Sequence, residues 1–382
     1  MGFCVRVAVF NALIGLAGGG ERVAVGFARA FEELGYGVTL FTFGDRFRGV
    51  DEAFRLLGGY RPGDVVVLEP PFSVRVLGVG GRFVRFRKLM LFRRFLSLVK
   101  GMGFDLVVDT SSNAPTAVDI SYIHYPAVFG RSPGDEGRGP HWRVYNWLVE
   151  RSVRGVVGGT RLVLANSYWT LGLFRRVWGD GYRSYVLHPP VDVEFFGCGG
   201  YKEDLVVTVS RFTPEKRIED LVYAAKELEG YRFVFAGSTH AYSDSVIRAI
   251  RERAERLGAK NIEILVNLSR EDLRDLLCRA RYYVHPPYPE HFGISVVEAM
   301  AAGCIPIVYR DGGAWTDVVS MVSGRLGYLD VTQIPRIVRG IDSNPALYKE
   351  LSAISRGVSR GFSYTAFKER LSVLLRKNNL VA

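Results

Sequence analysis

The sequence predicts an α/β protein with two doubly wound domains, each built on a parallel sheet. Short apolar runs rich in β-branched residues alternate with longer amphipathic stretches, and the alternation occurs in two successive series. Strands that are buried on both faces of a parallel sheet form continuous apolar runs, and their alternation with helices is typical of βαβ units. The chain of 382 residues is also longer than one hydrophobic core usually holds.

The first series predicts six strands, at residues 5–10, 38–43, 65–68, 106–109, 120–124 and 162–165. Helical spacing of apolar residues lies between them, at residues 21–34 and 143–154. The second series predicts five strands, at residues 205–210, 232–236, 262–265, 282–285 and 305–308. Its helices are expected at residues 218–228, 245–257, 270–280 and 296–302.

The boundary between the two series falls near Pro189 and Pro190, because successive prolines favour extended backbone and interrupt both patterns. We expect residues 1–188 to form an N-terminal domain and residues 189–362 a C-terminal domain. Open α/β sheets bind ligands beyond the carboxyl ends of their strands. With two such domains facing each other, the cleft between them is the expected active site.

The composition is that of a folded protein with a basic surplus. Hydrophobic residues make up 48% and charged residues 23%, which excludes a disordered chain. Fifty basic and 39 acidic residues give a net charge of +11, and residues 1–190 contribute 24 basic and 15 acidic side chains. Nucleic acid, an anionic membrane surface and phosphorylated substrates are all partners that suit such a surplus. The surplus belongs mainly to the N-terminal half.

The four cysteines lie far apart and form no CxxC pair. We therefore expect reduced thiols, and neither a disulfide framework nor a cysteine-ligated zinc site. The N-terminus lacks the pattern of a signal peptide, and no uncharged apolar run approaches the ~18–20 residues that span a bilayer. The expectation is a protein that is soluble or lies on a membrane surface.

Two loops after predicted strands could bind an anion. Gly18, Gly19 and Gly20 follow the first strand and open a helix, so that backbone N–H groups and the helix N-terminus can approach a phosphate. In the segment Ser210-Arg211-Phe212-Thr213-Pro214-Glu215-Lys216-Arg217, Arg211 and Lys216 follow the first strand of the second half. The alternatives are a flexible glycine loop and a solvated basic turn.

The most informative segment is Pro289-Glu290-His291-Phe292-Gly293-Ile294-Ser295-Val296-Val297-Glu298-Ala299-Met300-Ala301-Ala302-Gly303. Gly293 permits a tight turn that leaves the backbone donors of residues 292–295 directed at a ligand. The helix begins near Ser295, which places Glu298 about one turn in and Glu290 in the loop before it. A glutamate in an otherwise apolar helix, one turn after a glycine loop, favours a binding site over a solvated helix face.

This segment resembles the signature of the retaining family 4 glycosyltransferases of GT-B fold. The glycine loop, the Arg211–Lys216 segment and Asp311-Gly312-Gly313 occur in the order that this family shows. The resemblance is strongest to mannosyltransferases that elongate lipid-linked oligosaccharides on the cytosolic side of a membrane, through motifs similar to Gly18-Gly19-Gly20-Glu21-Arg22, Tyr122-Ile123-His124-Tyr125-Pro126 and Asn166-Ser167-x-Trp169-Thr170. One departure is Asp317, in Ala314-Trp315-Thr316-Asp317, where many relatives have a glutamate after the Gly-Gly pair.

The resemblance implies two Rossmann-like domains facing across a cleft, with residues 363–382 forming a helix that crosses back to the N-terminal domain. The N-terminal domain would carry the acceptor and face the membrane, and the C-terminal domain would bind the nucleotide sugar. The implied reaction transfers a hexose to a lipid-linked acceptor. The expected hexose is mannose, and the expected donor is GDP-mannose. The protein would then be cytoplasmic and peripheral on the cytosolic face of a membrane.

The resemblance also assigns roles to residues. Arg211 and Lys216 would neutralise the diphosphate of the leaving group, Glu290 would contact the sugar hydroxyls, and His124 would lie beside the transferred sugar. The expected donor-binding residues are Gly19, Gly20, Arg211, Lys216, Phe292, Gly293, Ile294, Ser295 and Glu298. The chain has no Asp-x-Asp pair, so no metal and no other cofactor is expected. For His124 the alternative is a structural histidine at a strand end, and for Asn166 and Ser167 it is a helix N-cap.

A basic segment in the N-terminal half is a candidate membrane contact. No acidic residue occurs from Pro70 to Phe104, where the expected acceptor or membrane residues are Arg85, Lys88, Arg93 and Arg94. Phe92, Phe95, Leu96 and Val99 follow helical spacing, as in helices that lie in a membrane interface. The alternative is a helix that packs this apolar side inward and exposes a solvated basic face. Nucleic-acid binding is disfavoured because no recognised motif accompanies the patch.

Three rival functions stay open at the level of sequence. A UDP-sugar donor with another glycolipid or a soluble acceptor would use the same fold. A nucleotide-sugar epimerase would need no acceptor, and the paired basic and acidic residues favour transfer over it. A membrane or nucleic-acid adaptor that kept the fold without catalysis is disfavoured because every charged motif residue is present.

Overall fold

The computed structural model describes residues 5–44, 49–70, 84–126, 144, 147, 151, 155–239 and 242–380, with only the backbone of residues 84–88. The chain divides into two compact units. The N-terminal unit comprises Met1–Pro190 and Tyr364–Ala382, and the C-terminal unit comprises Val191–Ser363. The predicted domain boundaries lie between residues 188 and 189 and between residues 362 and 363. Both are within two residues of the places where the chain passes from one unit to the other.

The N-terminal unit contains a seven-stranded sheet in the order β3-β2-β1-β4-β5-β6-β7, and every neighbouring pair is parallel. Six strands match the predicted runs, and β7 was not predicted. The strands are β1 (Arg6–Phe10), β2 (Gly37–Phe43), β3 (Asp64–Leu68), β4 (Leu106–Asp109), β5 (Ile120–Ile123), β6 (Leu162–Ala165) and β7 (Ser184–Val186).

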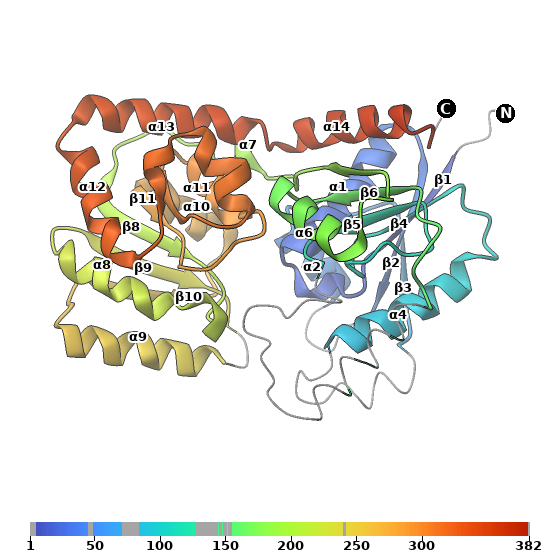
Figure 1. Cartoon of the computed structure of the whole chain (residues 1–382), viewed down its shortest axis with the longest axis horizontal. Helices are drawn as coiled ribbons and strands as arrows, with labels where there is room; N and C mark the ends of the chain where they lie inside the picture. Colours follow the sequence, from blue (N-terminus) through green and yellow to red (C-terminus); the bar gives the residue numbers. More distant parts are fainter. Residues whose placement is uncertain are drawn as a thin grey trace. The chain divides into compact units, whose positions relative to one another are not determined.

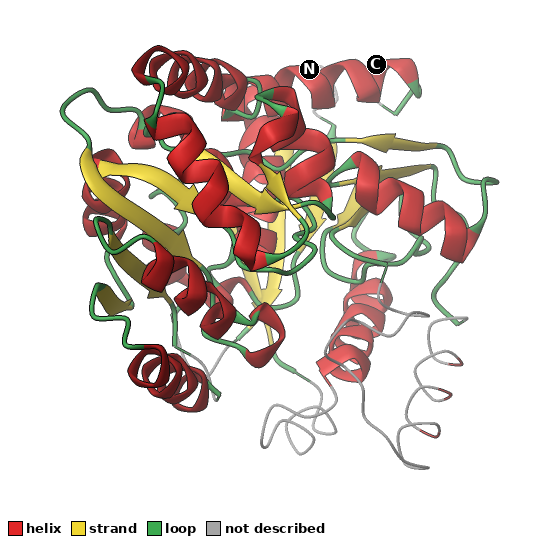
Figure 2. Cartoon of the chain, turned by 60° about the vertical axis from the view of Figure 1, so that its left-hand side comes forward, coloured by secondary structure: helices red, strands yellow, loops and turns green. Residues whose placement is uncertain are grey.

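Helices cover both faces of this sheet (Figure 2). They are α1 (Gly19–Glu33), α2 (Val50–Leu56), α4 (Val84–Val99), α6 (Tyr168–Trp178) and α14 (Tyr364–Lys377), with a short turn at η1 (Ile14–Leu16). The last helix of the chain, α14, packs beside α1, as Figure 1 shows, with the Phe27 and Phe367 rings 5.3 Å apart. Most of the helix expected at residues 143–154 lies outside the described residues.

The C-terminal unit contains a six-stranded parallel sheet in the order β10-β9-β8-β11-β12-β13. Its strands are β8 (Glu203–Val209), β9 (Arg232–Gly237), β10 (Ile262–Val266), β11 (Ala280–Val284), β12 (Ile305–Tyr309) and the unpredicted β13 (Gly327–Tyr328). Two parallel α/β units of this kind confirm the predicted fold class.

The helices of this unit include three that the sequence did not suggest, α7, α12 and α13. The α-helices are α7 (Val193–Phe196), α8 (Val222–Glu227), α9 (Ser243–Leu257), α10 (Arg270–Arg279), α11 (Ile294–Ala301), α12 (Ile334–Asp342) and α13 (Pro345–Arg360). Shorter turns are η3 (Pro214–Lys216), η4 (Ile218–Leu221), η5 (Ala314–Val318), η6 (Val319–Met321), η7 (Gly324–Leu326) and η8 (Val331–Gln333).

The packing of helix α4 decides between the two interpretations of its apolar side, insertion into a membrane interface and packing in the core. Phe92, Phe95, Leu96 and Val99 are buried in the core of the N-terminal unit, and the Phe95 ring stacks on Phe10 of β1 at 4.4 Å. The apolar side therefore packs inward and is not available for insertion into lipid. Arg93 and Arg94 are exposed, so the basic side faces solvent, while the side chains of Arg85 and Lys88 lie outside the described residues.

The expectation of reduced thiols was wrong for two cysteines. Cys198, just after α7, forms a disulfide with Cys278 on α10. Their separation of 80 positions in the sequence concealed this contact, because α7 packs against α10 in the folded unit. An ion pair between Asp192 and Arg270, at 2.8 Å, joins the opposite ends of the same two elements. Cys304 is buried with a free thiol.

We expect reduction of this disulfide to destabilise the C-terminal unit by up to about 4.5 kcal/mol, the loop-closure value for a loop of this length. Dithiothreitol should lower the urea midpoint of the wild-type protein. A Cys198→Ser/Cys278→Ser variant is the control, because its midpoint should be low already and should not respond to the reductant. If the urea midpoint of the wild-type protein were the same with and without dithiothreitol, this would contradict the presence of the disulfide.

Candidate active site

The carboxyl ends of β8 and β11 mark the place in the C-terminal sheet where a ligand is expected. The strand order reverses between these two central neighbours, since β9 and β10 extend the sheet on one side and β12 and β13 on the other. Ligands of open α/β sheets bind at such a switch point, beyond the strand ends. The loop after β8 carries Arg211 and Lys216, and the loop after β11 carries Glu290.

Lys216 and Glu290 form a largely buried ion pair across this switch point. Lys216 Nζ donates to Glu290 Oε2 at 2.7 Å, and the side chains are 8% and 24% exposed. The Lys216 ammonium also lies 4.0 Å from the centre of the Tyr288 ring. Arg211, in contrast, is exposed. The two loops therefore pair a buried lysine with the carboxylate, and the lysine loop also carries a solvent-exposed arginine.

A histidine contributes a second contact to Glu290. His285 follows the last residue of β11, is 2% exposed, and has Nε2 at 3.3 Å from Glu290 Oε2. Burial alone raises the pKa of Glu290, but the Lys216 charge and the hydrogen bond from His285 outweigh it and hold the pKa well below its ordinary value. Glu290 is thus an anion at neutral pH.

The glycine motif after β12 fixes the backbone of Glu290. Gly312 pairs with Glu290 in an isolated parallel bridge, and the Ala314 N–H donates to the Glu290 carbonyl at 3.2 Å. Gly312 has a φ of +94°, and a Cβ there would lie 2.3 Å from the Glu290 carbonyl oxygen. Only glycine fits this approach. Asp317, the departure from the family pattern, is buried on η5 and accepts the Thr316 hydroxyl at 2.6 Å.

The N-terminus of α11 closes the site. Gly293 has a φ of +90° and caps the helix, which begins at Ile294. Phe292 is buried, and the hydroxyl of Ser295 lies 2.9 Å from that of Tyr283 on β11. One turn further, Glu298 is buried in the helix. The predicted donor-binding residues of this half therefore follow β8 and β11, as does Glu290, which was predicted to contact the sugar: Arg211, Lys216, Phe292, Gly293, Ile294, Ser295 and Glu298.

His291 lies beside the ion pair and resists protonation. Burial, together with the Lys216 and Arg211 charges, lowers its pKa to about 4 against the opposing effect of the Glu290 charge. In the unfolded chain, the pKa of His291 has its ordinary value of about 6.5. Between pH 4 and pH 6.5, His291 is therefore protonated in the unfolded chain and neutral in the folded chain. The contribution of His291 to stability is therefore complete above pH 6.5 and is lost as the pH falls toward 4.

We expect His291 to account for about 2 kcal/mol of the difference in unfolding free energy between pH 7 and pH 5. Urea titrations at the two pH values measure it. The His291→Gln variant is the control, because it should show a smaller loss than the wild type by that amount. Equal pH dependence in the two proteins would mean that His291 is protonated normally in the fold.

The residues predicted in the N-terminal unit form a second cluster, at the carboxyl ends of β4 and β5. His124 follows β5, and its Nε2 lies 3.0 Å from the Thr110 carbonyl after β4. Asn113 Oδ1 accepts the His124 N–H at 2.7 Å. A Cβ built on Gly20 would lie 3.5 Å from His124 Nε2, so the glycine at the start of α1 faces the imidazole ring. Gly19 is the first residue of the same helix.

Ser167 has the helix N-cap role that was the alternative for Asn166 and Ser167, whereas Asn166 makes a different contact. Ser167 caps α6, and its hydroxyl accepts the Thr170 N–H at 3.0 Å. Asn166 Nδ2 donates to the His124 carbonyl at 3.0 Å, which ties the β6 end to the β5 end. The pair therefore supports His124.

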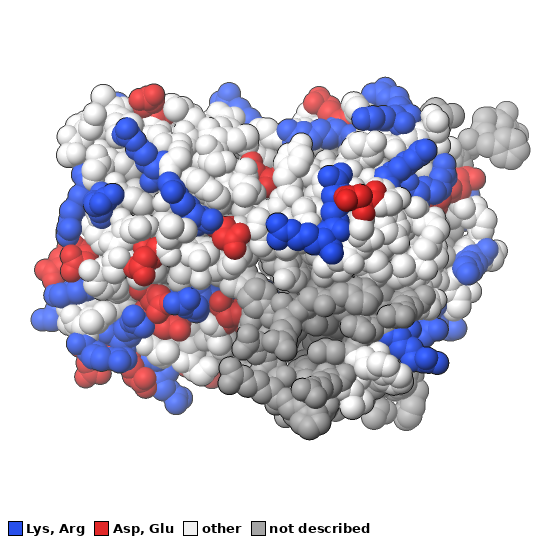
Figure 3. Space-filling model, viewed as in Figure 1, with Lys and Arg blue, Asp and Glu red and all other residues white. Residues whose placement is uncertain are grey.

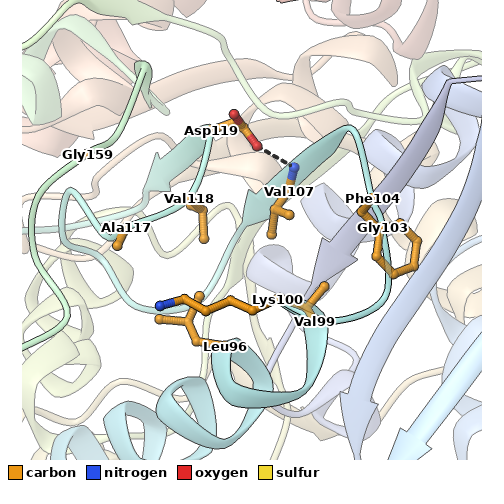
Figure 4. A pocket seen from close by; sticks show the side chains of 10 residues that line it. All are labelled: Leu96, Val99, Lys100, Gly103, Phe104, Val107, Ala117, Val118, Asp119 and Gly159. Carbon is orange, nitrogen blue, oxygen red and sulfur yellow. Dashed lines mark hydrogen bonds between the residues drawn. The ribbon is translucent and has the colours of Figure 1, made fainter.

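A pocket of about 270 Å³ lies at the opposite ends of the N-terminal strands. Figure 4 shows it between the last turn of α4, with Leu96 and Lys100, and the chain that leads into β5, where Asp119 accepts the Val107 N–H at 2.9 Å. The pocket contains none of the predicted site residues. Among the residues that the structure describes, no group of three His, Cys, Asp or Glu side chains could hold a metal ion.

Comparison with known families covers both units. A family model described as Glycosyltransferase Family 4 matches residues 17–195, and one described as Glycosyl transferases group 1 matches residues 200–342. The chain carries two glycosyltransferase domains, one of family 4 and one of group 1. The two matches divide close to the boundary between the N-terminal and C-terminal units.

Named relatives of this chain include mannosyltransferases. The protein named GDP-Man:Man(3)GlcNAc(2)-PP-Dol alpha-1,2-mannosyltransferase from Mus musculus is 29% identical over 245 residues, which is 55% of this chain and 50% of that protein. The protein of the same name from Dictyostelium discoideum is 26% identical over 59% of this chain and 50% of its own length. The chain thus spans about half the length of these curated relatives.

Solved structures share the fold of this chain. Anabaena Alr3699/HepE in complex with UDP and glucose has a TM-score of 0.73 and 15% identity, over 98% of this chain and 100% of that one. Sucrose-phosphate synthase from Thermosynechococcus elongatus has a TM-score of 0.75 and 16% identity, over 98% of both chains. The predicted GT-B class, with two Rossmann-like domains, is confirmed.

His285 and Gly312 both contact Glu290, but neither was assigned a site role from the sequence. His285 was included in the run expected as a strand at 282–285, although a polar residue at a strand end five positions before Glu290 could have indicated a site residue. Gly312 was noted only as part of a motif. Its positive φ and its contact with Glu290 give it a structural reason.

Proposed function

We propose that this protein is a retaining hexosyltransferase that moves mannose from GDP-mannose to a lipid-linked saccharide at a membrane surface. The observation that carries the proposal is the gathering of Arg211, Lys216 and Glu290 at the β8–β11 switch point of a chain with two glycosyltransferase domains. The names of its relatives support GDP-mannose as donor and a lipid-linked oligosaccharide as acceptor.

The chemistry requires stabilisation of the leaving diphosphate. The bond between the sugar C1 and the β-phosphate oxygen breaks, and its electron pair leaves with GDP. An acceptor hydroxyl bonds to C1 on the same face, and its proton passes to the departing β-phosphate oxygen. Arg211 is exposed for a bidentate contact to phosphate. The Lys216 ammonium has three N–H donors. One donates to Glu290, and the other two can donate to phosphate oxygens. The N-terminus of α11 adds backbone donors.

The two units would divide the work. The C-terminal unit would bind the donor, and the N-terminal unit would carry the acceptor, with His124 beside the transferred sugar. The proposal assigns neutralisation of the diphosphate to side chains and helix N–H groups, without a metal ion. Turnover should therefore persist in the presence of EDTA, and a strict requirement for added Mg²⁺ or Mn²⁺ would contradict this part.

A donor screen tests the proposal. GDP-mannose, UDP-glucose and UDP-N-acetylglucosamine are each supplied with and without a lipid-linked acceptor, and products are separated by mass. We expect transfer from GDP-mannose only when the acceptor is present. Transfer from a UDP sugar would change the donor, whereas conversion of the sugar without acceptor would indicate an epimerase. Absence of nucleoside diphosphate binding by calorimetry would favour a non-catalytic adaptor.

The membrane part of the proposal rests on the basic side of α4. No helix among the described residues is long and apolar enough to cross a membrane. Figure 3 shows mainly basic side chains on the N-terminal unit and mixed charges on the C-terminal unit. Exposed arginines beside anionic lipid contribute about 1 kcal/mol each. With the apolar side of α4 buried, the contact proposed is electrostatic and peripheral.

We expect replacement of the four basic α4 residues by glutamine to weaken binding to anionic liposomes by about tenfold or more. The residues changed are Arg85, Lys88, Arg93 and Arg94. The matched control changes four basic residues on and just after α9 of the C-terminal unit, all exposed: Arg248, Arg251, Arg256 and Lys260. Co-sedimentation measures both. Equal loss from the two variants would mean that net charge, and not α4, determines binding.

A further inference from the structure

His285 is a buried histidine with a fixed position at the switch point. Its backbone N–H donates to the Ile307 carbonyl of β12 at 2.9 Å, and its own carbonyl accepts the Tyr328 hydroxyl of β13 at 2.6 Å. The residue is 2% exposed. Neighbouring strands therefore determine where the imidazole ring lies, before any ligand binds.

Both ring nitrogens of His285 face oxygen acceptors. Nδ1 lies 3.0 Å from the Pro286 carbonyl oxygen, and Nε2 lies 3.3 Å from Glu290 Oε2. A carbonyl and a carboxylate only accept hydrogen bonds, and a neutral imidazole has only one N–H to donate. The ring satisfies both partners only when both nitrogens carry protons, and it then adds a positive charge beside Glu290.

The Glu290 carboxylate is held at one of its two oxygens. Lys216 Nζ and His285 Nε2 both contact Oε2. Within the described part of the chain, no hydrogen bond or ion pair of Oε1 accompanies them, while the bridge to Gly312 fixes the backbone of the same residue. The carboxylate is thus oriented from the side of β8, from β11 and through its own main chain.

We propose that His285 is a positioning residue for Glu290, which it holds together with Lys216 so that the Oε1 atom is presented to the sugar of the donor. The inference rests on the proposed function and deepens it. His285 touches neither the diphosphate nor the sugar in this account. Loss of its N–H groups should leave binding of the nucleotide intact and impair recognition of the attached sugar.

The test uses His285→Phe, which keeps a ring of similar size and removes both donors, and His285→Gln, which restores one. The donor is the nucleotide sugar with the highest wild-type turnover, and the second probe is its nucleoside diphosphate. We expect kcat to fall about 10- to 100-fold in His285→Phe, as for loss of a hydrogen bond to a charged group. His285→Gln should recover part of the rate. The dissociation constant of the nucleoside diphosphate should stay within about twofold.

Thr208→Val is the matched control. Thr208 on β8 is buried and donates to the Val284 carbonyl at 2.8 Å, one residue before His285, so this variant loses a buried hydrogen bond without touching Glu290. A kcat for His285→Phe no lower than for Thr208→Val would overturn the inference. Equal weakening of nucleotide and nucleotide-sugar binding would also overturn it, in favour of a structural role. A wild-type protein that binds no nucleoside diphosphate would overturn the proposed function, and this inference with it.

Discussion

Glu290→Ala is expected to abolish sugar transfer, with a fall in rate of at least about 100- to 1,000-fold. The substitution removes the carboxylate that the fold holds between Lys216 and His285 at the proposed sugar site. Lys216→Ala should have the same effect, because it removes a donor to the diphosphate and the principal partner of Glu290. Initial rates at saturating donor and acceptor measure both. A near-normal rate in either variant would remove that residue from the site.

Glu290→Ala should also lower the free energy of unfolding. Without Glu290, the largely buried Lys216 ammonium loses its counter-charge, and breaking a buried pair in this way costs about 3–5 kcal/mol. Urea titration measures the loss. The control is Glu229→Ala, which breaks a Lys–Glu pair with Lys226 on the surface, where Glu229 is 69% exposed. That variant should keep both its rate and its urea midpoint, since exposed pairs contribute little.

Gly312→Ala is expected to lower both stability and transfer. Its Cβ would lie 2.3 Å from the Glu290 carbonyl oxygen and 2.7 Å from the Glu290 nitrogen, so the backbone of Glu290 must move. Overpacking costs about 1–3 kcal/mol, and a left-handed backbone costs an L-residue about 1–2 kcal/mol more. A displacement of Glu290 by about 1 Å would reduce the rate about 100-fold. Thermal unfolding and initial rates measure the two effects.

Gly258→Ala separates the two causes. Gly258 at the end of α9 has a φ of +67°, but no atom lies within 4 Å of a Cβ built there. This variant should therefore lose only the left-handed contribution to stability and should transfer sugar normally. If Gly312→Ala retained the rate of Gly258→Ala, the contact between the glycine motif and Glu290 would have no part in catalysis.

Most of the sheet could be predicted from sequence because its central strands are buried on both faces. Continuous apolar runs mark such strands without reference to their neighbours. The two missed strands are short and lie at sheet edges: β7 has three residues and β13 has two, Gly327 and Tyr328. Helix α13 was missed although Asn344 caps it and Pro345 opens it, two signals that were readable.

The site was predictable in its residue types and less so in its contacts. Arg211, Lys216 and Glu290 follow strands, and strand ends of parallel sheets gather at one edge. That Lys216 pairs with Glu290, 74 positions away, depends on the order of strands, which no local pattern contains. The same limit concealed the disulfide. For α4, helical spacing of Phe92, Phe95 and Val99 is equally suited to lipid and to a core, and only the packing decided between them.

The assignment of α14 to the N-terminal unit has a consequence for how the chain matures on the ribosome. Phe367, Leu371 and Leu375 complete a core that otherwise consists of residues made before position 190. During vectorial synthesis the C-terminal unit emerges in one piece and can fold at once. The N-terminal unit, although made first, cannot complete its core until α14 has left the exit tunnel. Its unfinished apolar face is then the surface that chaperones are expected to protect, and a premature stop codon would harm the half of the protein farthest from it in sequence.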